Sequence, residues 1–136
     1  ACGGSFNHRM GLFDRALIKD NHLAAAGIKD LNSLVNFLLA AREQAKGKLI
    51  ELEIDHLEQL EYAILGGVDA VLLDNFTPQE VAQAVEINQN RVVLEASGCI
   101  NRGNLHEYAK AKPHFISTGA PVHSAKWVDI GLDWIN

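Results

Sequence analysis

The chain has 136 residues, of which 48% are hydrophobic and 21% charged, and its 12 Lys and Arg against 17 Asp and Glu give a net charge of −5. These proportions are typical of a soluble globular domain and exclude an intrinsically disordered chain. The acidic balance argues against partners such as nucleic acid or an anionic membrane surface. Without an apolar run of roughly 18 residues or a signal-peptide pattern, we expect a cytoplasmic protein with two reduced thiols, Cys2 and Cys99.

Short apolar runs alternate with amphipathic segments along the chain. We expect strands at 17–18, 49–54, 70–73, 92–94 and 115–116. A helix over about 31–46, ended by Gly47, follows the first strand, and a helix ending near residue 65 follows the second. A helix from 77, a short helix from Asn101 and a last short helix opened by Ser124 follow the third, fourth and fifth strands.

Two of these helix starts carry the residues of a capping box. Asp55 with Glu58 precedes the second helix, and Thr77 with Glu80 precedes the third, where Pro78 also occupies the first helical position.

About five strand–helix units in succession predict an α/β fold with parallel strands covered by helices. Either a doubly wound sheet or a (β/α) barrel fits this pattern. The barrel is favoured because charged and polar residues end five consecutive strands, namely Lys19, Asp20, Glu53, Asp55, Asp74, Glu95 and Ser117. A complete barrel takes about 250 residues, so we expect a partial TIM-like barrel from which an N-terminal part is missing.

The strand over 49–54 places Glu51 and Glu53 on one face and its isoleucines and leucine on the other. Packing of the apolar face under helices would point both glutamates into the barrel, and the alternative is an edge strand with one solvated face. Asp74 ends the next strand, which predicts neighbouring carboxylates at one level. Glu53 and Asp74 offer the oxygen ligands of a Mg²⁺ site, and their alternative role is as ordinary capping or ion-paired acids.

Two further groups of residues carry candidate chemistry. His8, Arg9 and Lys19 form a basic group suited to a small polycarboxylate or phosphate, although a solvated loop with incidental charges is an equal alternative. Ser97-Gly98 and Thr118-Gly119-Ala120 follow the last two strands, where barrels commonly bind phosphate, and His123 lies just beyond. The sequence has no HxH, HExxH or cysteine–histidine set, so no zinc site is expected.

Read together, six stretches resemble the quinolinate phosphoribosyltransferase family: CGGSFNHRMGLFD, LIKDNH, ELEIDHLEQLE, GVDAVLLDNFTP, VVLEASGCI and STGAPVHSAKWVDIGLD. The resemblance implies transfer of phosphoribose from phosphoribosyl pyrophosphate (PRPP) to quinolinate with Mg²⁺, giving nicotinate mononucleotide, pyrophosphate and CO₂ in NAD biosynthesis. By the same resemblance, His8, Arg9 and Lys19 would bind quinolinate, with Lys19, Glu53 and Asp74 as catalytic residues and Glu53 and Asp74 at the Mg²⁺–PRPP site. Ser97, Gly98, Gly119, Ala120 and His123 would bind phosphate.

The chain departs from the family at Ser5, Cys99 and Pro121-Val122, which replace more usual residues near these loops. Family members are about twice as long, with an N-terminal α/β domain and earlier barrel strands that carry further basic residues, and they form dimers or larger homo-oligomers. We therefore expect residues 1–136 to be the C-terminal part of the barrel, inactive alone. The alternatives are a non-catalytic fragment that binds PRPP or phosphate, and a related transferase with another acceptor.

Overall fold

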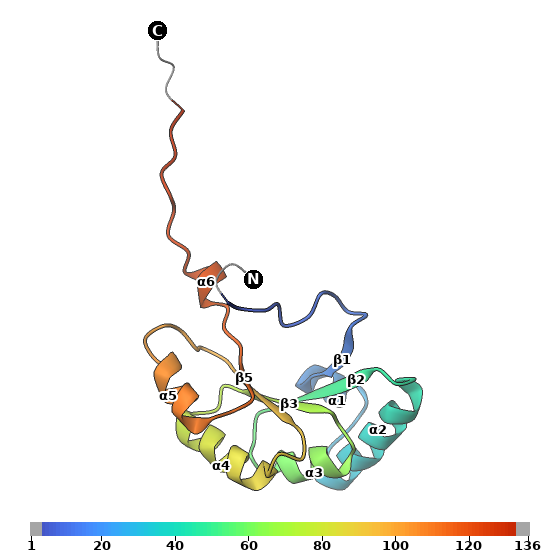
Figure 1. Ribbon diagram of the computed structural model, residues 1–136. Coiled ribbons are helices and arrows are strands. Elements are labelled where there is room, and N and C mark those ends of the chain that lie inside the picture. The colour runs from blue at the N-terminus through green and yellow to red at the C-terminus, as the bar shows by residue number, and fades with distance from the viewer. Residues whose placement is uncertain (1–3, 133–136) are drawn as a thin grey trace.

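The computed structural model describes residues 4–132. Its sheet has five strands, which pair in chain order and are all parallel (Figure 1): β1 (Arg15–Ile18), β2 (Leu49–Ile54), β3 (Ala70–Asp74), β4 (Val93–Ser97) and β5 (Phe115–Ile116). The predicted parallel α/β architecture is confirmed. The sheet remains open, with β1 and β5 at its two edges, as expected for part of a barrel.

Helices follow the strands, and most of them cover one face of the sheet. They are α1 (Asp20–Ala25), α2 (Leu31–Gln44), α3 (Gln59–Leu65), α4 (Pro78–Asn88), α5 (Leu105–Ala111) and α6 (Ala120–His123). In Figure 1, α2 to α5 form a layer along one side of the sheet, while the segment before β1 and the short α6 lie toward the other side. The inner face of the partial barrel therefore faces the segment before β1.

The core lies between the sheet and the layer of helices. Ile50, Leu52 and Ile54 of β2 are buried there together with Leu38 of α2 and Leu60 of α3. Glu51 and Glu53 consequently project from the opposite, inner face, as the alternation in β2 predicts. Since β2 pairs with strands on both sides, the alternative of a solvated edge strand is wrong.

The start of α4 confirms the capping box at Thr77. Its side chain accepts a hydrogen bond from the Glu80 amide at 3.3 Å, and the Glu80 carboxylate accepts one from the Thr77 amide at 2.8 Å, with Pro78 in the first turn. These contacts satisfy two amides at the start of the helix, where no intrahelical acceptor is available.

The capping box predicted at Asp55 and Glu58 is wrong. The side chain of Gln59 instead accepts hydrogen bonds from the amides of Asp55 and His56, at 3.1 and 3.0 Å, and α3 begins only at Gln59. The Gln59 side chain, one residue after Glu58, is therefore the hydrogen-bond acceptor at this helix start in place of the acidic side chains.

Two later helix starts also differ from prediction. The helix predicted from Asn101 begins later, because Asn104 immediately precedes α5. The Oδ1 atom of Asn101 accepts a hydrogen bond from the Gly103 amide, at 2.8 Å, within the turn before that helix. Ser124 follows α6 rather than opening a helix, because α6 ends at His123. Strand β4 also begins at Val93 and runs on to Ser97, beyond the predicted 92–94.

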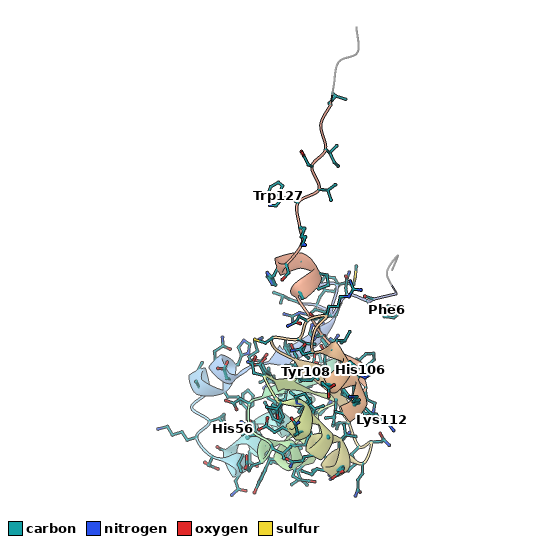
Figure 2. All side chains as sticks on the ribbon, turned by 90° about the vertical axis from the view of Figure 1, so that its left-hand side faces the viewer. Phe6, His56, His106, Tyr108, Lys112 and Trp127 are labelled. Carbon is teal, nitrogen blue, oxygen red and sulfur yellow. The ribbon has the colours of Figure 1, made fainter. Side chains whose placement is uncertain are left out.

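Apolar side chains remain exposed at both ends of the described chain. Phe6 is 94% exposed and Trp127 is fully exposed on the extended segment that leads away from the sheet (Figure 2). Within residues 4–132, no helix combines the length and apolar character needed to cross a bilayer. Cys99 is an exposed free thiol, whereas Cys2 lies outside the described residues.

Candidate active site

The inner face of the sheet carries the polar side chains singled out in the sequence. Register places Glu53 opposite Leu72 of β3, and Leu72 in turn opposite Glu95 of β4. Asp74 pairs instead with Ser97, two residues further along. The expectation that Glu53 and Asp74 lie at one level is therefore wrong, since Asp74 is offset toward the carboxyl end of the strands. Both side chains still project from the same face.

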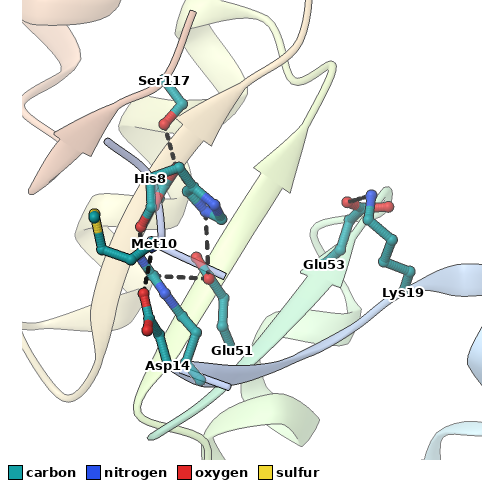
Figure 3. A network of polar contacts seen from close by, with 9 residues as sticks. His8, Met10, Asp14, Lys19, Glu51, Glu53 and Ser117 are labelled. Atoms are coloured by element: carbon teal, nitrogen blue, oxygen red, sulfur yellow. Dashed lines mark hydrogen bonds and ion pairs between the residues drawn. The ribbon is translucent and has the colours of Figure 1, made fainter. Parts of the chain in front are cut away.

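Lys19 and Glu53 form one pair at this edge. Lys19 directly follows β1, and its ammonium lies 2.5 Å from Oε2 of Glu53 (Figure 3). The Glu53 side chain is mostly buried, whereas that of Lys19 is 42% exposed. Asp74 lies at the end of the neighbouring strand, where it accepts a hydrogen bond from the Asn75 side chain at 2.8 Å. The three predicted catalytic residues thus occupy the ends of three consecutive strands.

His8 belongs to a second, deeper cluster on the same face. Its Nε2 atom lies 3.5 Å from the Glu51 carboxylate and 3.2 Å from that of Glu95 (Figure 3). The guanidinium of Arg15 donates to Glu51 at 2.8 Å, and the Ser117 hydroxyl donates to Glu95. Strands β1, β2 and β4 and the residue after β5 therefore converge on one buried pair of carboxylates.

The environment of Glu51 disfavours its ionised form. Burial raises the pKa of Glu51 above its ordinary value of 4.5, and the negative charge of Glu95 raises it further. Arg15 and His8 act in the opposite direction without overcoming burial. A carboxyl whose pKa is raised by burial and by a neighbouring charge, in a cleft, is a feature of functional sites.

The structure divides the predicted basic group. His8 contacts Glu51 and Glu95, whereas Lys19 contacts Glu53, so the two side chains share no partner. Arg9 is half-buried on the segment that follows His8, and in the part of the chain that the structure describes its guanidinium forms no ion pair. Among the described residues, these three side chains therefore have no ionic partner in common.

The predicted phosphate-binding residues do come together. Ser97, Gly98, Gly119, Ala120 and His123 all line one hollow of about 370 Å³ at the carboxyl ends of β4 and β5. A neighbouring hollow of about 780 Å³ shares Ser97 and Gly119 with it, and His8, Arg15 and Glu95 also line this larger space. An anion held by the glycine loops would therefore lie next to the His8 cluster.

Glycine is required at position 98. Its φ of +98° lies in a region that side-chain-bearing residues rarely adopt, and a Cβ atom there would come within 2.6 Å of the Asn75 backbone nitrogen. This close approach joins the loop after β4 to the loop after β3. It is reinforced by the hydrogen bond from the Asn75 amide to the Ser97 carbonyl, at 2.9 Å.

The carboxylates of Glu53 and Asp74 fit a Mg²⁺ ion shared with a phosphate ligand. They offer oxygen atoms alone, from adjacent strands and on one face, and Mg²⁺ is commonly held by one or two carboxylates plus substrate phosphates. Lys19 already neutralises much of the Glu53 charge. Asp74 is therefore the more available ligand of the two.

Sequence reasoning assigned no functional role to Arg15, Glu51 or Asn75. For Glu51 a signal existed, because the alternation in β2 put it on the inner face beside Glu53. Arg15 alternates with Leu17 and Lys19 in the same way. Asn75 carries no sequence signal, since its role depends on a left-handed backbone conformation with φ of 57°.

Three of the four residues that depart from the resembled family line the same two hollows. Ser5 and Pro121 border the larger one, and Cys99 borders the smaller one. Ser5, Pro121 and Cys99 would therefore contact a ligand bound in these hollows. Substitution at these positions alters the shape of the hollows and leaves the hydrophobic core unchanged.

Comparison with known proteins identifies similar chains. The family model described as "Quinolinate phosphoribosyl transferase, C-terminal domain" matches residues 1–133. A carboxylating nicotinate-nucleotide pyrophosphorylase of Mycobacterium leprae is 42% identical, with 96% of this chain and 45% of that protein covered. A probable carboxylating nicotinate-nucleotide pyrophosphorylase of Methanocaldococcus jannaschii is 38% identical, with 96% and 47% covered. The chain thus spans slightly less than half the length of these curated relatives.

Solved structures agree with these matches. The nicotinate-nucleotide pyrophosphorylase of Ehrlichia chaffeensis superposes with a TM-score of 0.82 at 37% identity and covers 96% of this chain and 46% of that one. The corresponding protein of Francisella tularensis gives 0.79 at 41% identity, covering 88% and 41%. A thiamine phosphate pyrophosphorylase of Pyrococcus furiosus, with a TM-score of 0.65 at 18% identity, covers 83% and 52% and shows likeness of fold alone.

Proposed function

Since the chain belongs to the quinolinate phosphoribosyl transferase family, through its C-terminal domain, we propose that it forms the catalytic barrel portion of a carboxylating nicotinate-nucleotide pyrophosphorylase. The reaction would transfer phosphoribose from PRPP to the ring nitrogen of quinolinate and release pyrophosphate and CO₂. The observation that carries this proposal is the convergence of both glycine loops on one hollow at the carboxyl ends of β4 and β5.

Each part of the site suits one part of the substrates. The loops with Ser97, Gly98, Gly119 and Ala120, together with His123, would hold a phosphate group of PRPP. Transfer at the anomeric carbon builds positive charge on the ribose, as in other glycosyl transfers. The Glu53 and Asp74 carboxylates would stabilise that charge from the strand ends.

Charge also explains the remaining assignments. Quinolinate is a dianion, so His8, Arg9 and Lys19 would bind its carboxylates and orient the nitrogen toward the sugar. Because Lys19 already lies against Glu53, it would connect the acceptor to the ribose. Mg²⁺ bound through Asp74 and Glu53 would neutralise charge on the departing pyrophosphate.

A complete site needs more than this chain. The open edges of the sheet and the coverage of under half of the relatives support a partner that supplies the N-terminal part of the enzyme. We propose that this partner completes the barrel and adds further basic side chains to the acceptor pocket. We also propose that the assembled protein works in the cytoplasm as a dimer or larger homo-oligomer.

The test measures CO₂ release from carboxyl-labelled quinolinate in the presence of PRPP and Mg²⁺. We expect no turnover by the chain alone and turnover once the polypeptide with the N-terminal part of the enzyme is added. Replacing Glu53 by Gln should lower the restored rate by about 100-fold, the typical effect of removing one group that stabilises a developing charge. Glu43→Gln, on the exposed side of α2, is the matched control and should leave the rate unchanged.

A second candidate is a non-catalytic module that binds PRPP or phosphate. It is favoured by one observation: the hollow at the glycine loops is formed by residues of this chain, whereas His8 and Lys19 pair with different carboxylates. Saturable PRPP binding without CO₂ release, even with the N-terminal polypeptide present, would establish this alternative. Phosphoribosyl transfer to a different acceptor would instead indicate a related transferase.

A further inference from the structure

The buried cluster of His8, Glu51 and Glu95 has the composition of a metal site, and of its three residues the proposed reaction uses His8 alone. One donor atom from each of the three residues lies within 4.8 Å of the other two. Glu51 is completely buried and Glu95 is only 5% exposed. Two carboxylates that face each other away from water repel, and a cation between them relieves that repulsion.

Two polar atoms in this cluster lack hydrogen bonds. Within the described residues, Nε2 of His8 and Oε1 of Glu51 have no hydrogen-bond partner, although both are buried. His8 lies within ion-pair distance of both carboxylates but forms no hydrogen bond with either of them through Nε2. A buried acceptor left unpartnered in this way costs free energy that a ligand can recover.

The separations between donor atoms match those around a small metal ion. A tetrahedral site with metal–ligand bonds of about 2.0–2.1 Å holds neighbouring donor atoms about 3.3 Å apart. The His8 nitrogen lies 3.2 Å from Oε1 of Glu95 and 3.5 Å from Oε2 of Glu51, the oxygen that also accepts from Arg15. One oxygen of each carboxylate lies within 4.8 Å of the other, so the three side chains can reach one ion in common after local adjustment.

The surrounding residues act as outer partners that hold the ligands in place. Arg15 donates to Oε2 of Glu51 and leaves Oε1 available, while the Ser117 hydroxyl donates to Glu95 (Figure 3). Metal-binding carboxylates are commonly hydrogen-bonded in this way. His8 and Glu95 also line the larger hollow, so a fourth coordination position would face open space.

We infer that His8, Glu51 and Glu95 bind a divalent transition-metal ion of the Zn²⁺ class, with the fourth position open to water or a small anion. One imidazole with two carboxylates suits Zn²⁺ better than Mg²⁺, which prefers oxygen ligands alone. The sequence predicted no zinc site because the three ligands come from separate segments. The inferred site shares His8 with the proposed acceptor pocket, but its test is separate from the proposed transferase function, since metal binding is measured without PRPP or quinolinate.

The test is calorimetric titration of the chelator-stripped chain with Zn²⁺. We expect saturation at one ion per chain and no displacement by excess Mg²⁺. His8→Ala should weaken the affinity by about tenfold or more, as should Glu95→Gln, which keeps an oxygen for the Ser117 hydroxyl. His106→Ala, which removes an exposed imidazole on α5 (Figure 2), is the matched control and should change nothing.

His8→Ala is not expected to impair folding, because His8 precedes β1 and contributes nothing to the core. Circular dichroism verifies this. Co²⁺ gives a second readout, since the intense visible bands of a four-coordinate ion should appear with the native chain and disappear with His8→Ala. Failure to bind Zn²⁺ at a single site, or equal affinity in the native and His8→Ala chains, would overturn the inference.

Discussion

Replacement of Gly98 by Ala tests the close approach between the loops after β3 and β4. The backbone at this glycine has φ of +98°, and an added Cβ would lie 2.6 Å from the Asn75 nitrogen. That nitrogen already donates to the Ser97 carbonyl, so it cannot move away without breaking a backbone hydrogen bond. Both strain at the substituted residue and displacement of its neighbour are therefore expected.

The two costs can be separated with a control. Placing a side-chain-bearing residue at positive φ costs about 1–2 kcal/mol, and overpacking against fixed atoms adds about 1–3 kcal/mol. Gly67 also has positive φ, at +74°, but a Cβ there would meet nothing within 4 Å. Gly67→Ala should therefore incur the first cost alone, and Gly98→Ala should be less stable than Gly67→Ala by about 1–3 kcal/mol.

The assay is urea unfolding of both variants, followed by circular dichroism, with phosphate affinity as a second measurement. Gly98→Ala should also lose phosphate affinity, because Gly98 lines the smaller hollow, whereas Gly67→Ala should retain it. Equal stability of the two variants would refute the reasoning, since the contact with Asn75 would then contribute nothing to the loop.

Two further substitutions test buried polar groups. Asn88 is 1% exposed and bonds both backbone groups of Val92, donating to its carbonyl at 2.8 Å and accepting from its amide at 3.1 Å. Asn88→Ala should therefore lower the unfolding free energy by about 2 kcal/mol. A loss below about 0.5 kcal/mol in urea unfolding would contradict this role. Because the pKa of Glu51 is raised in the folded state, its ionisation destabilises the fold progressively as pH rises from 4.5 through the folded value. In chelating buffer, the unfolding free energy of Glu51→Gln relative to that of the native chain should therefore increase from acidic to neutral pH. A difference between the two chains that stays constant with pH would contradict the raised pKa.

Local patterns predicted the parts of the fold that depend on near neighbours. The capping box of Thr77 and Glu80 formed because both partners lie within one helical turn. The alternation in β2 correctly placed Glu51 and Glu53 on the inner face. At Asp55, local reasoning was wrong because the Gln59 side chain competed for the same amides.

The candidate site required information that no short window holds. The carboxyl ends of β4 and β5 meet at one edge of the sheet, so the two glycine loops could be expected to converge. Strand register, in contrast, determined that Asp74 is offset from Glu53, and register depends on the pairing of whole strands. The contact of His8 with Glu51 and Glu95 depends on how the segment before β1 folds over the sheet.

The pairing of strands in chain order has a consequence for cooperativity. Each strand hydrogen-bonds only to strands adjacent in sequence, so the sheet resembles a one-dimensional array with nearest-neighbour coupling. Opening of such an array begins at its ends, where a unit has one neighbour in place of two. The two-residue β5 carries Ser117 and the second glycine loop immediately after it. Fraying from that end would therefore dismantle the phosphate hollow while the amides of β3 remain protected from hydrogen exchange.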